Sequence, residues 1–297
     1  MVSTDSLKLG LSTFVLASPF SDNDLPLFRK VRQWGYDHVE VCIEDPRTLT
    51  PAKVASAAAN EGLAVLVCGA FGPDRDVSHE DADRRQGGID YLRGCVDFAA
   101  EVGSPLVSGP MYATTGQARL LDPDERRAQW ERGVTSLQEV AKHASDAQVS
   151  LAIEPLNRFE TDLINTVEQG LAFCHDIDAD NVGLMLDTFH MNIEEKNLPE
   201  AIRLAGPRIL NFQASENDRG TPGTGHVDWI GVIGALRSTS YRGGIVVESF
   251  LPTVKEIARA VSLWRPVAPS MDSLAAEGAK FLAGLLDLGD KSSGSTA

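Results

Sequence analysis

Hydrophobic and polar positions along the chain follow two alternating patterns. Short runs rich in β-branched and other apolar residues recur eight times, and longer stretches with helical spacing separate them. The runs are Lys8–Phe14, His38–Ile43, Leu63–Ala70, Pro105–Gly109, Val149–Glu154, Val182–Asp187, Ile209–Ala214 and Gly244–Phe250. Nearly continuous apolar strands joined by helices are typical of a parallel sheet whose faces are covered.

The clearest helical stretch is Ala82–Val102. Its apolar residues form one stripe: Ile89, Leu92, Val96, Phe98, Ala99 and Val102. A doubly wound sheet would carry Gly-x-Gly-x-x-Gly after its first strand, but Leu16-Ala17-Ser18-Pro19 stands there. Eight βα units in 297 residues without a dividing linker predict the α/β class and a single (β/α)₈ TIM barrel over residues 1–290. We expect a flexible C-terminal tail at 291–297.

Composition and charge narrow the possible partners. Hydrophobic residues make up 43% of the chain, which is enough apolar surface for a folded core. The formal net charge is −15, and this sign argues against binding to nucleic acid or to an anionic membrane surface. No apolar run reaches the roughly 18 residues of a transmembrane helix. The first residues also lack the pattern of a secretory signal, so we expect a cytoplasmic protein.

Four cysteines are scattered along the chain: Cys42, Cys68, Cys95 and Cys174. No C-x-x-C pair occurs, so the spacing indicates neither a zinc site nor a disulfide framework. Cys68 closes the third apolar run, where its side chain could line a pocket. A small buried filler is the more common role for such a cysteine.

Ligand-type residues stand where four consecutive runs end: Glu154, Asp187, Gln213 and Glu248. His190 follows three residues after Asp187, and Glu216 follows three residues after Gln213. The active sites of TIM barrels lie at the carboxyl ends of the strands, so these side chains are expected to converge at the mouth of the barrel.

Three carboxylates in one site of low dielectric constant would repel one another strongly. A divalent cation relieves that repulsion, and oxygen ligands suit a hard ion such as Mn²⁺ or Mg²⁺. The alternative is that the carboxylates are solvated and paired with arginines. A single such residue would favour that alternative, whereas four in succession favour a metal site.

Several longer motifs resemble those of the ketose 3-epimerases, such as the D-tagatose and D-psicose 3-epimerases, in the sugar-phosphate isomerase/epimerase-like TIM-barrel superfamily. The motifs are Ile153–Thr161 (IEPLNRFET), Leu186–Glu195 (LDTFHMNIEE), Ser215–Gly220 (SENDRG), Gly223–Trp229 (GTGHVDW) and Val247–Phe250 (VESF). The resemblance is strong from Val149 to Phe250. Over the N-terminal half it is looser and rests mainly on the rhythm of strands and helices.

This resemblance implies roles for individual residues. The metal ligands would be Glu154, Asp187, the residue of the seventh strand and Glu248. Glu154 and Glu248 would also form the acid/base pair, on opposite faces of the sugar. The implied substrate-binding residues are Glu160, His190 and Arg219. We expect Mn²⁺ as the cofactor, with Mg²⁺ or Co²⁺ as alternatives.

The seventh strand departs from the epimerase pattern. Epimerases carry a histidine ligand there, whereas this chain has Gln213. A glutamine at this position resembles superfamily dehydratases that enolise a ketone and then expel a β-substituent. C-glycoside deglycosidases share this chemistry on 3-keto-glycosides, and their catalytic subunit works with a small β-rich partner subunit. The glutamine therefore leads us to favour a β-eliminating lyase.

Three alternatives remain open at this point. The closest is a ketose 3-epimerase, in which a proton returns to the opposite face of the sugar. An endonuclease of the same fold is disfavoured by the net charge and by the few histidine ligands. A non-catalytic barrel is disfavoured by the Glu154 and Glu248 pair. We expect a sugar or glycoside as the small-molecule partner. The expected assembly is a homo-oligomer, or a hetero-oligomer with a β subunit if the protein is a deglycosidase.

Overall fold

Eight parallel strands close into a barrel in the computed structural model, which describes residues 7–293. Each strand pairs with the next along the chain, and the last pairs with the first. The strands are β1 (Lys8–Ser12), β2 (His38–Ile43), β3 (Ala64–Gly69), β4 (Leu106–Gly109), β5 (Ser150–Ile153), β6 (Val182–Asp187), β7 (Ile209–Ala214) and β8 (Gly244–Val247). The predicted TIM barrel is confirmed.

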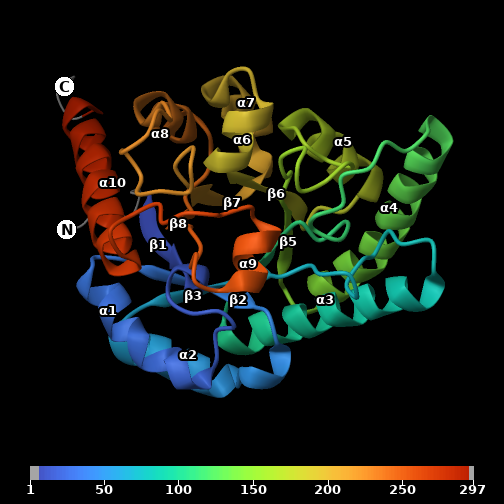
Figure 1. Cartoon of the computed structure of the whole chain (residues 1–297), viewed down its shortest axis with the longest axis horizontal. Coiled ribbons are helices and arrows are strands. Elements are labelled where there is room, and N and C mark those ends of the chain that lie inside the picture. Colours follow the sequence, from blue (N-terminus) through green and yellow to red (C-terminus); the bar gives the residue numbers. More distant parts are fainter. Residues whose placement is uncertain (1–6, 294–297) are drawn as a thin grey trace.

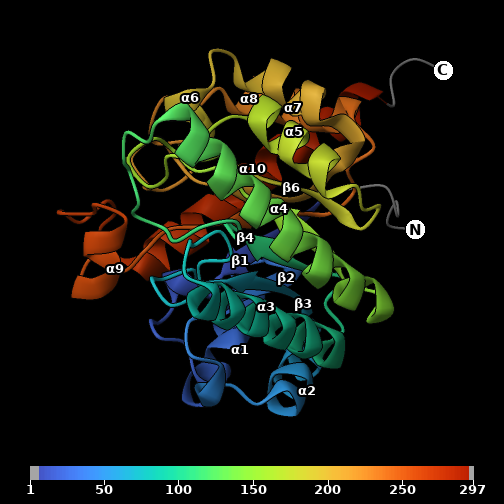
Figure 2. The ribbon, with the colours of Figure 1, turned by 90° about the vertical axis from the view of Figure 1, so that its right-hand side faces the viewer.

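Helices surround the strands (Figure 1). The α-helices are α1 (Phe28–Gln33), α2 (Pro51–Glu61), α3 (Ala82–Val102), α4 (Pro123–Asp146), α5 (Val167–Ile177), α6 (Thr188–Glu194), α7 (Leu198–Ala205), α8 (Trp229–Ser238), α9 (Lys255–Ala260) and α10 (Met271–Ser293). Short 3₁₀ helices are η1 (Thr13–Val15), η2 (Asp22–Leu27), η3 (Pro46–Thr48) and η4 (Gly206–Arg208). Figure 2 shows α9 projecting from the body that the other helices form.

The sequence marks the ends of the long helices clearly. The Asp122 side chain accepts hydrogen bonds at the start of α4, and Glu125 reaches back to complete a capping box. The Asp81 carboxylate accepts two backbone N–H groups at the start of α3. That helix ends at Gly103, whose φ of 76° suits a residue without a Cβ atom.

The two faces of the barrel differ in chemistry. Outward-facing residues such as Val41, Val67 and Phe212 belong to the large apolar core between strands and helices. Inside the barrel, Leu66, Leu106 and Val246 form a small apolar layer. Polar side chains lie among the other inward-facing residues: Glu40, Ser108, Asn211 and Gln213, all fully buried. The interior is therefore a filled core that becomes polar toward the active-site end.

Observed element boundaries differ slightly from the predicted ones. The first strand stops at Ser12 because Thr13–Val15 turns into a 3₁₀ helix. Helix α10 runs to Ser293, three residues into the predicted tail, and residues 294–297 lie outside the described part of the chain. Among the described helices, none combines the length and the apolar character that crossing a bilayer requires.

Candidate active site

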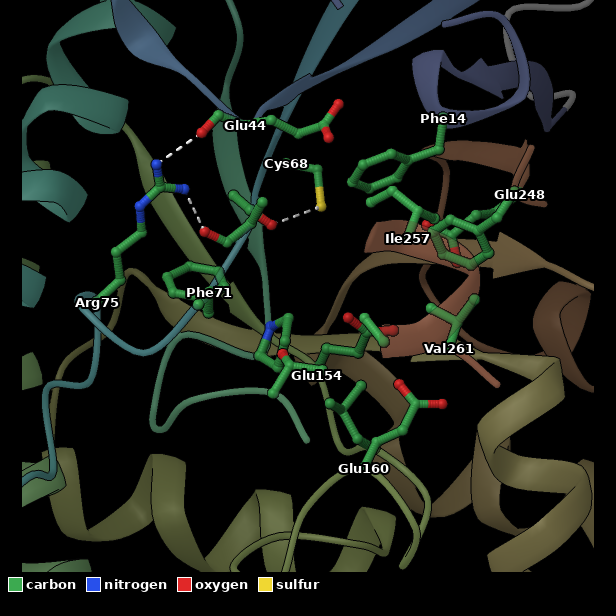
Figure 3. A pocket seen from close by; sticks show the side chains of 18 of the residues that line it. Phe14, Glu44, Cys68, Phe71, Arg75, Glu154, Glu160, Glu248, Ile257 and Val261 are labelled. Atoms are coloured by element: carbon green, nitrogen blue, oxygen red, sulfur yellow. Dashed lines mark hydrogen bonds between the residues drawn. The ribbon is translucent and has the colours of Figure 1, made fainter. Parts of the chain in front are cut away.

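A cavity of about 490 Å³ opens at the carboxyl ends of the strands (Figure 3). Five of the predicted site residues line it: Glu154, Glu160, His190, Arg219 and Glu248. Apolar side chains complete much of the wall, among them Phe14, Phe71, Phe250, Ile257 and Val261. Asp187 and Gln213 contact the polar wall residues from behind. The structure thus gathers all seven predicted site residues in one place.

Asp187 both ends β6 and starts α6. Its Oδ1 atom accepts the backbone N–H of Phe189 at 2.8 Å, the usual bond of an N-cap residue. This bond leaves Oδ2 directed at the site, where Arg219 Nη1 lies 2.6 Å away. The first turn of α6 also places His190 Nε2 at 3.7 Å from the same Oδ2 atom. One capping interaction therefore fixes two site residues.

Arg219 is the centre of the charged cluster. Its Nη1 atom donates to Asp187 and to Glu248 Oε2, the latter at 2.8 Å. The guanidinium carbon lies 4.0 Å from the centroid of the Phe189 ring and 5.0 Å from that of Phe250, within the range of cation–π contacts. The Arg219 backbone has a φ of 65°, a left-handed conformation that non-glycine residues seldom adopt outside tightly constrained sites.

The loop that carries Arg219 is built around a buried carboxylate. Glu216 accepts the backbone N–H groups of Gly223 at 2.8 Å and Val227 at 3.0 Å. It also accepts the indole N–H of Trp229 at 2.9 Å. The sequence places Glu216 three residues after Gln213, near a strand end. In the structure its carboxylate stabilises the loop, and it does not line the cavity. It acts as a positioning residue for Arg219.

Gln213 links the site to the interior of the barrel. Its Nε2 atom donates to Glu40 Oε2 at 2.6 Å and to Glu248 Oε1 at 3.1 Å. This orientation leaves the Gln213 Oε1 atom buried and without a hydrogen-bond partner among residues 7–293. Buried polar oxygens are nearly always paired, so an atom of this kind is available to a ligand that the protein chain itself does not supply.

His190 is oriented by Asn157. The backbone N–H of Asn157 donates to His190 Nδ1 at 3.1 Å, so that ring nitrogen is an acceptor. Burial lowers the pKa of His190, which favours the neutral ring with its proton on Nε2. Nε2 lies 3.5 Å from Glu154 Oε1 and 3.1 Å from Arg219 Nη2. Two donors, His190 Nε2–H and Arg219 Nη2–H, thus converge beside the cavity.

The acidic side chains carry strongly perturbed pKa values. Burial and the nearby carboxylates of Glu248 and Asp187 raise the pKa of Glu154 well above its usual range. Burial raises the pKa of Glu248 to about 8, although Arg219 partly opposes this effect. Burial also raises the pKa of Glu40. The single guanidinium of Arg219 therefore does not balance these carboxylates, and without a further cation burial favours their protonated forms.

The donor set is suitable for a hard divalent cation. One ligand atom from each of Glu154, Asp187 and His190 lies within 4.8 Å of the others. Glu248 joins this group through Arg219, and Gln213 joins it through Glu248. Carboxylate oxygens, an unpaired amide oxygen and excess negative charge are the features expected of a site for Mn²⁺ or Mg²⁺. The buried cluster is consistent with a metal site.

Comparison with known proteins agrees with this geometry. Residues 28–282 match the family described as xylose isomerase-like TIM barrel. The chain belongs to this family.

Individual relatives show which members of the xylose isomerase-like family this chain is similar to in sequence and fold. A probable ketose 3-epimerase of Synechocystis sp. is 33% identical over 282 residues, which is 95% of this chain and 98% of that protein. The structure of an L-ribulose 3-epimerase is 31% identical, with a TM-score of 0.91 and 98% of each chain covered. A D-allulose 3-epimerase from Methylomonas sp., solved with D-allulose, is 28% identical, with a TM-score of 0.88 over 94% of this chain and 97% of that one. The chain is thus a carbohydrate epimerase-family enzyme of the xylose isomerase-like group.

These comparisons correct the preference for a lyase. Seven of the curated relatives are ketose 3-epimerases, and a more distant one is a 3-dehydro-D-guloside 4-epimerase of Escherichia coli. These matches support the alternative reading, and they give no support to a deglycosidase or to its β subunit. That preference rested on Gln213, and the structure offers another reason for an amide there. Its Nε2 atom donates hydrogen bonds to two buried carboxylates, Glu40 and Glu248. This role does not involve the leaving group of an elimination reaction.

Sequence reasoning missed several residues of this xylose isomerase-like site. Glu40 stands in the middle of β2, and a lone carboxylate inside an apolar run was a signal that could have found it. Asn157, which orients His190 and donates to Glu160 Oε1 at 2.8 Å, lies within a motif but was not singled out. The aromatic side chains of the cavity wall had no distinguishing signal, because similar residues fill the core.

Proposed function

We propose that this enzyme is a divalent-metal-dependent ketose 3-epimerase. The observation that carries the proposal is the pair of buried carboxylates, Glu154 and Glu248, which directly follow β5 and β8 and line one cavity beside the His190 and Arg219 donors. The similarity to ketose 3-epimerases over nearly the whole chain supports the same reaction. Mn²⁺ is the proposed ion, with Mg²⁺ or Co²⁺ as alternatives.

Glu154, Asp187, Gln213 and Glu248 would hold the ion. When bound, a divalent cation polarises a ketone carbonyl and stabilises the negative charge that develops on its oxygen. Asp187 contributes through Oδ2, since its Oδ1 atom is used in capping α6. Gln213 contributes its unpaired Oε1 atom, while its amide nitrogen keeps Glu40 and Glu248 in place.

Glu154 and Glu248 would exchange the proton at C3 of the ketose. One carboxylate takes the proton from C3, and the electron pair of that C–H bond forms a double bond between C2 and C3. The carbonyl oxygen receives the charge. The second carboxyl group then returns a proton to C3 from the opposite face, so that the configuration inverts. Burial raises the pKa of both groups, and a buried carboxylate is a stronger base than a solvated one.

His190, Arg219 and Glu160 would orient the sugar. The two donors His190 Nε2–H and Arg219 Nη2–H lie 3.1 Å apart and both need an acceptor, which a hydroxyl or carbonyl oxygen of the substrate provides. Glu160 accepts from Asn157 through Oε1, and its Oε2 atom is available to a sugar hydroxyl. Positioning of this kind accounts for much of the barrier reduction in enzymes that act on small substrates.

The proposal is tested by incubating the purified enzyme with Mn²⁺ and D-allulose, D-fructose or L-ribulose in D₂O. We expect formation of the C3 epimer with deuterium at C3, because the abstracted proton exchanges with solvent. A parallel incubation with a 3-keto-C-glycoside tests the lyase. Release of the aglycone without epimerisation of any free ketose would reject the epimerase assignment in favour of β-elimination.

A further inference from the structure

A second cluster of metal-ligating side chains lies inside the barrel, on the strands of the N-terminal half. Among the described residues, one ligand atom from each of Glu40, Cys42 and Cys68 lies within 4.8 Å of the others. All three residues are buried. Cys42 of β2 is paired in register with Cys68 of β3, so the two thiols stand side by side on the inner face of the sheet.

Within residues 7–293, the two thiols make only long hydrogen bonds. The Cys42 Sγ atom lies 3.3 Å from Ser12 Oγ, and Cys68 Sγ donates to the carbonyl of Gly69 at 3.5 Å. Cys68 also lines the cavity, and Figure 3 shows its sulfur in the cavity wall. A solute that enters the cavity therefore reaches Cys68 directly, whereas Cys42 is fully buried beside it.

Glu40 keeps the capacity to bind a further group. Its Oε2 atom accepts from Gln213 Nε2, and its Oε1 atom accepts from Asn211 Nδ2 at 2.6 Å, with a longer contact to Ser108. A carboxylate offers about four acceptor positions, so its hydrogen bonds here leave room for coordination to a cation. Those bonds also fix the carboxylate next to the thiols.

We propose that Glu40, Cys42 and Cys68 form a second metal site, selective for thiophilic d¹⁰ ions such as Zn²⁺ and Cd²⁺. Two thiolates and one carboxylate supply three protein ligands, and water from the cavity supplies the fourth of a tetrahedral set. Thiolates select such ions over Mg²⁺ or Mn²⁺, which prefer the oxygen donors of the C-terminal strands.

Binding requires the loss of at least two protons, one from each thiol, because thiolates are the ligands. The contact with Cys42 and burial raise the pKa of the Cys68 thiol well above its usual value, so Cys68 is protonated when no ion is bound. Each bound ion then displaces one proton from each thiol, and both protons leave through the cavity to solvent. Two thiolates and the Glu40 carboxylate carry three negative charges, so the site with a divalent ion bound has a net charge of −1.

The experiment is a titration of the full-length protein with Cd²⁺, before and after loading with Mn²⁺. We expect an ultraviolet thiolate-to-cadmium charge-transfer band that saturates at one Cd²⁺ per chain, with release of at least two protons, in both preparations. The variants C42A and C68A should each lose most of the band. The matched controls C95A and C174A remove buried cysteines of α3 and α5 and should retain it.

Several results would overturn the site. These are a wild-type protein that shows no thiolate band, a release of fewer than two protons, or a band that survives in both C42A and C68A. The first two measurements use the unaltered chain, so they hold even if a variant fails to fold. Cd²⁺ binding without a thiolate band would indicate the oxygen-rich site alone. None of these readouts depends on the epimerase assignment.

Discussion

The two halves of the barrel present different chemistry at the same level of the fold. Glu154 and Glu248 directly follow β5 and β8, and Asp187 and Gln213 lie within the last two residues of β6 and β7. The inward residues near the ends of β1–β4 are Ser12, Cys42, Cys68 and Ser108. Both sets are buried. All eight strands belong to one closed parallel barrel, so side-chain identity accounts for most of the difference.

This contrast indicates a division of labour within one cavity. The C-terminal half concentrates negative charge, which favours a hard cation and proton transfer. The N-terminal half contributes Phe14 and Phe71 to the apolar wall, which Phe250 and other residues of the C-terminal half complete, and the carbon skeleton of a sugar can pack against it. The sites proposed for hard and thiophilic ions meet at Glu40, which contacts Gln213.

The largest expected effect comes from the acid/base pair of the C-terminal half. E154Q and E248Q keep an oxygen at each position but remove the proton acceptor. We expect each to lower kcat for epimerisation at least about a hundredfold, which is the lower range for general acid–base catalysis. Deuterium incorporation at C3 of D-fructose, measured with saturating Mn²⁺, gives the loss directly.

A carboxylate from the N-terminal half serves as the matched control for that pair. Glu44 also lines the cavity, but its carboxylate accepts from Ser18 Oγ and the Phe20 N–H. E44Q should keep kcat within about tenfold of the wild-type value, or ~1.4 kcal/mol in barrier height. If E44Q lowered kcat as much as E154Q or E248Q does, the proposed distinction between the two halves would be wrong. Full activity in both E154Q and E248Q would mean that another group removes the proton at C3.

The charge of the C-terminal half should also appear in the pH dependence of stability. The pKa of Glu248 is raised from 4.5 to about 8 in the folded protein. A carboxyl group with a raised pKa stabilises the fold fully below pH 4.5, and this contribution is lost as the pH rises through about 8. Without metal, the protein should therefore lose stability across this range.

A bound cation reverses that trend, because it stabilises the ionised carboxylates. The difference in Tm between Mn²⁺-loaded and chelated protein should grow between about pH 5 and pH 8. Differential scanning calorimetry at several pH values measures this difference in Tm. Groups that titrate alike in the Mn²⁺-loaded and chelated protein contribute equally to both Tm values, so they do not affect the difference. A difference that stays constant or shrinks with pH would contradict a cation among these carboxylates.

The sequence predicts the site of the C-terminal half better than that of the N-terminal half. Periodicity defined eight strands, and the rule that barrel sites lie at strand ends then located residues such as Glu154 and Glu248. The pairing of Cys42 with Cys68 depends on the register between β2 and β3, which no local pattern specifies. The role of Gln213 depends on Glu40, a contact across the barrel between residues far apart in the chain.

A smaller effect is expected from Glu216, which supports the site without lining the cavity. E216Q replaces an acceptor of four N–H groups with an amide that places its own donor against some of them. We expect the free energy of unfolding to fall by about 1–3 kcal/mol, the cost of unsatisfied buried polar groups. Epimerisation should also slow, because Arg219 lies on this loop, whereas the exposed Glu101→Gln change on α3 should alter neither quantity.

The smallest expected change in activity is at Gln213. In Q213H an imidazole replaces the amide and restores the ligand that the resemblance to ketose 3-epimerases implies. If the proposed function is correct, the variant should bind Mn²⁺ at least as tightly and epimerise a ketose within about tenfold of the wild-type rate, or ~1.4 kcal/mol in the barrier. Isothermal titration and C3 exchange measure the two properties separately.

The same variant tests why an amide stands there. Gln213 donates to both Glu40 and Glu248, and a neutral imidazole has only one N–H to share between them. We therefore expect Q213H to lose stability even where metal affinity is kept, because one buried carboxylate loses its donor. If stability were unchanged while epimerisation collapsed with the metal still bound, the amide would instead act on the substrate. Such a result would return β-elimination to consideration and would separate this chain from the relatives it most resembles.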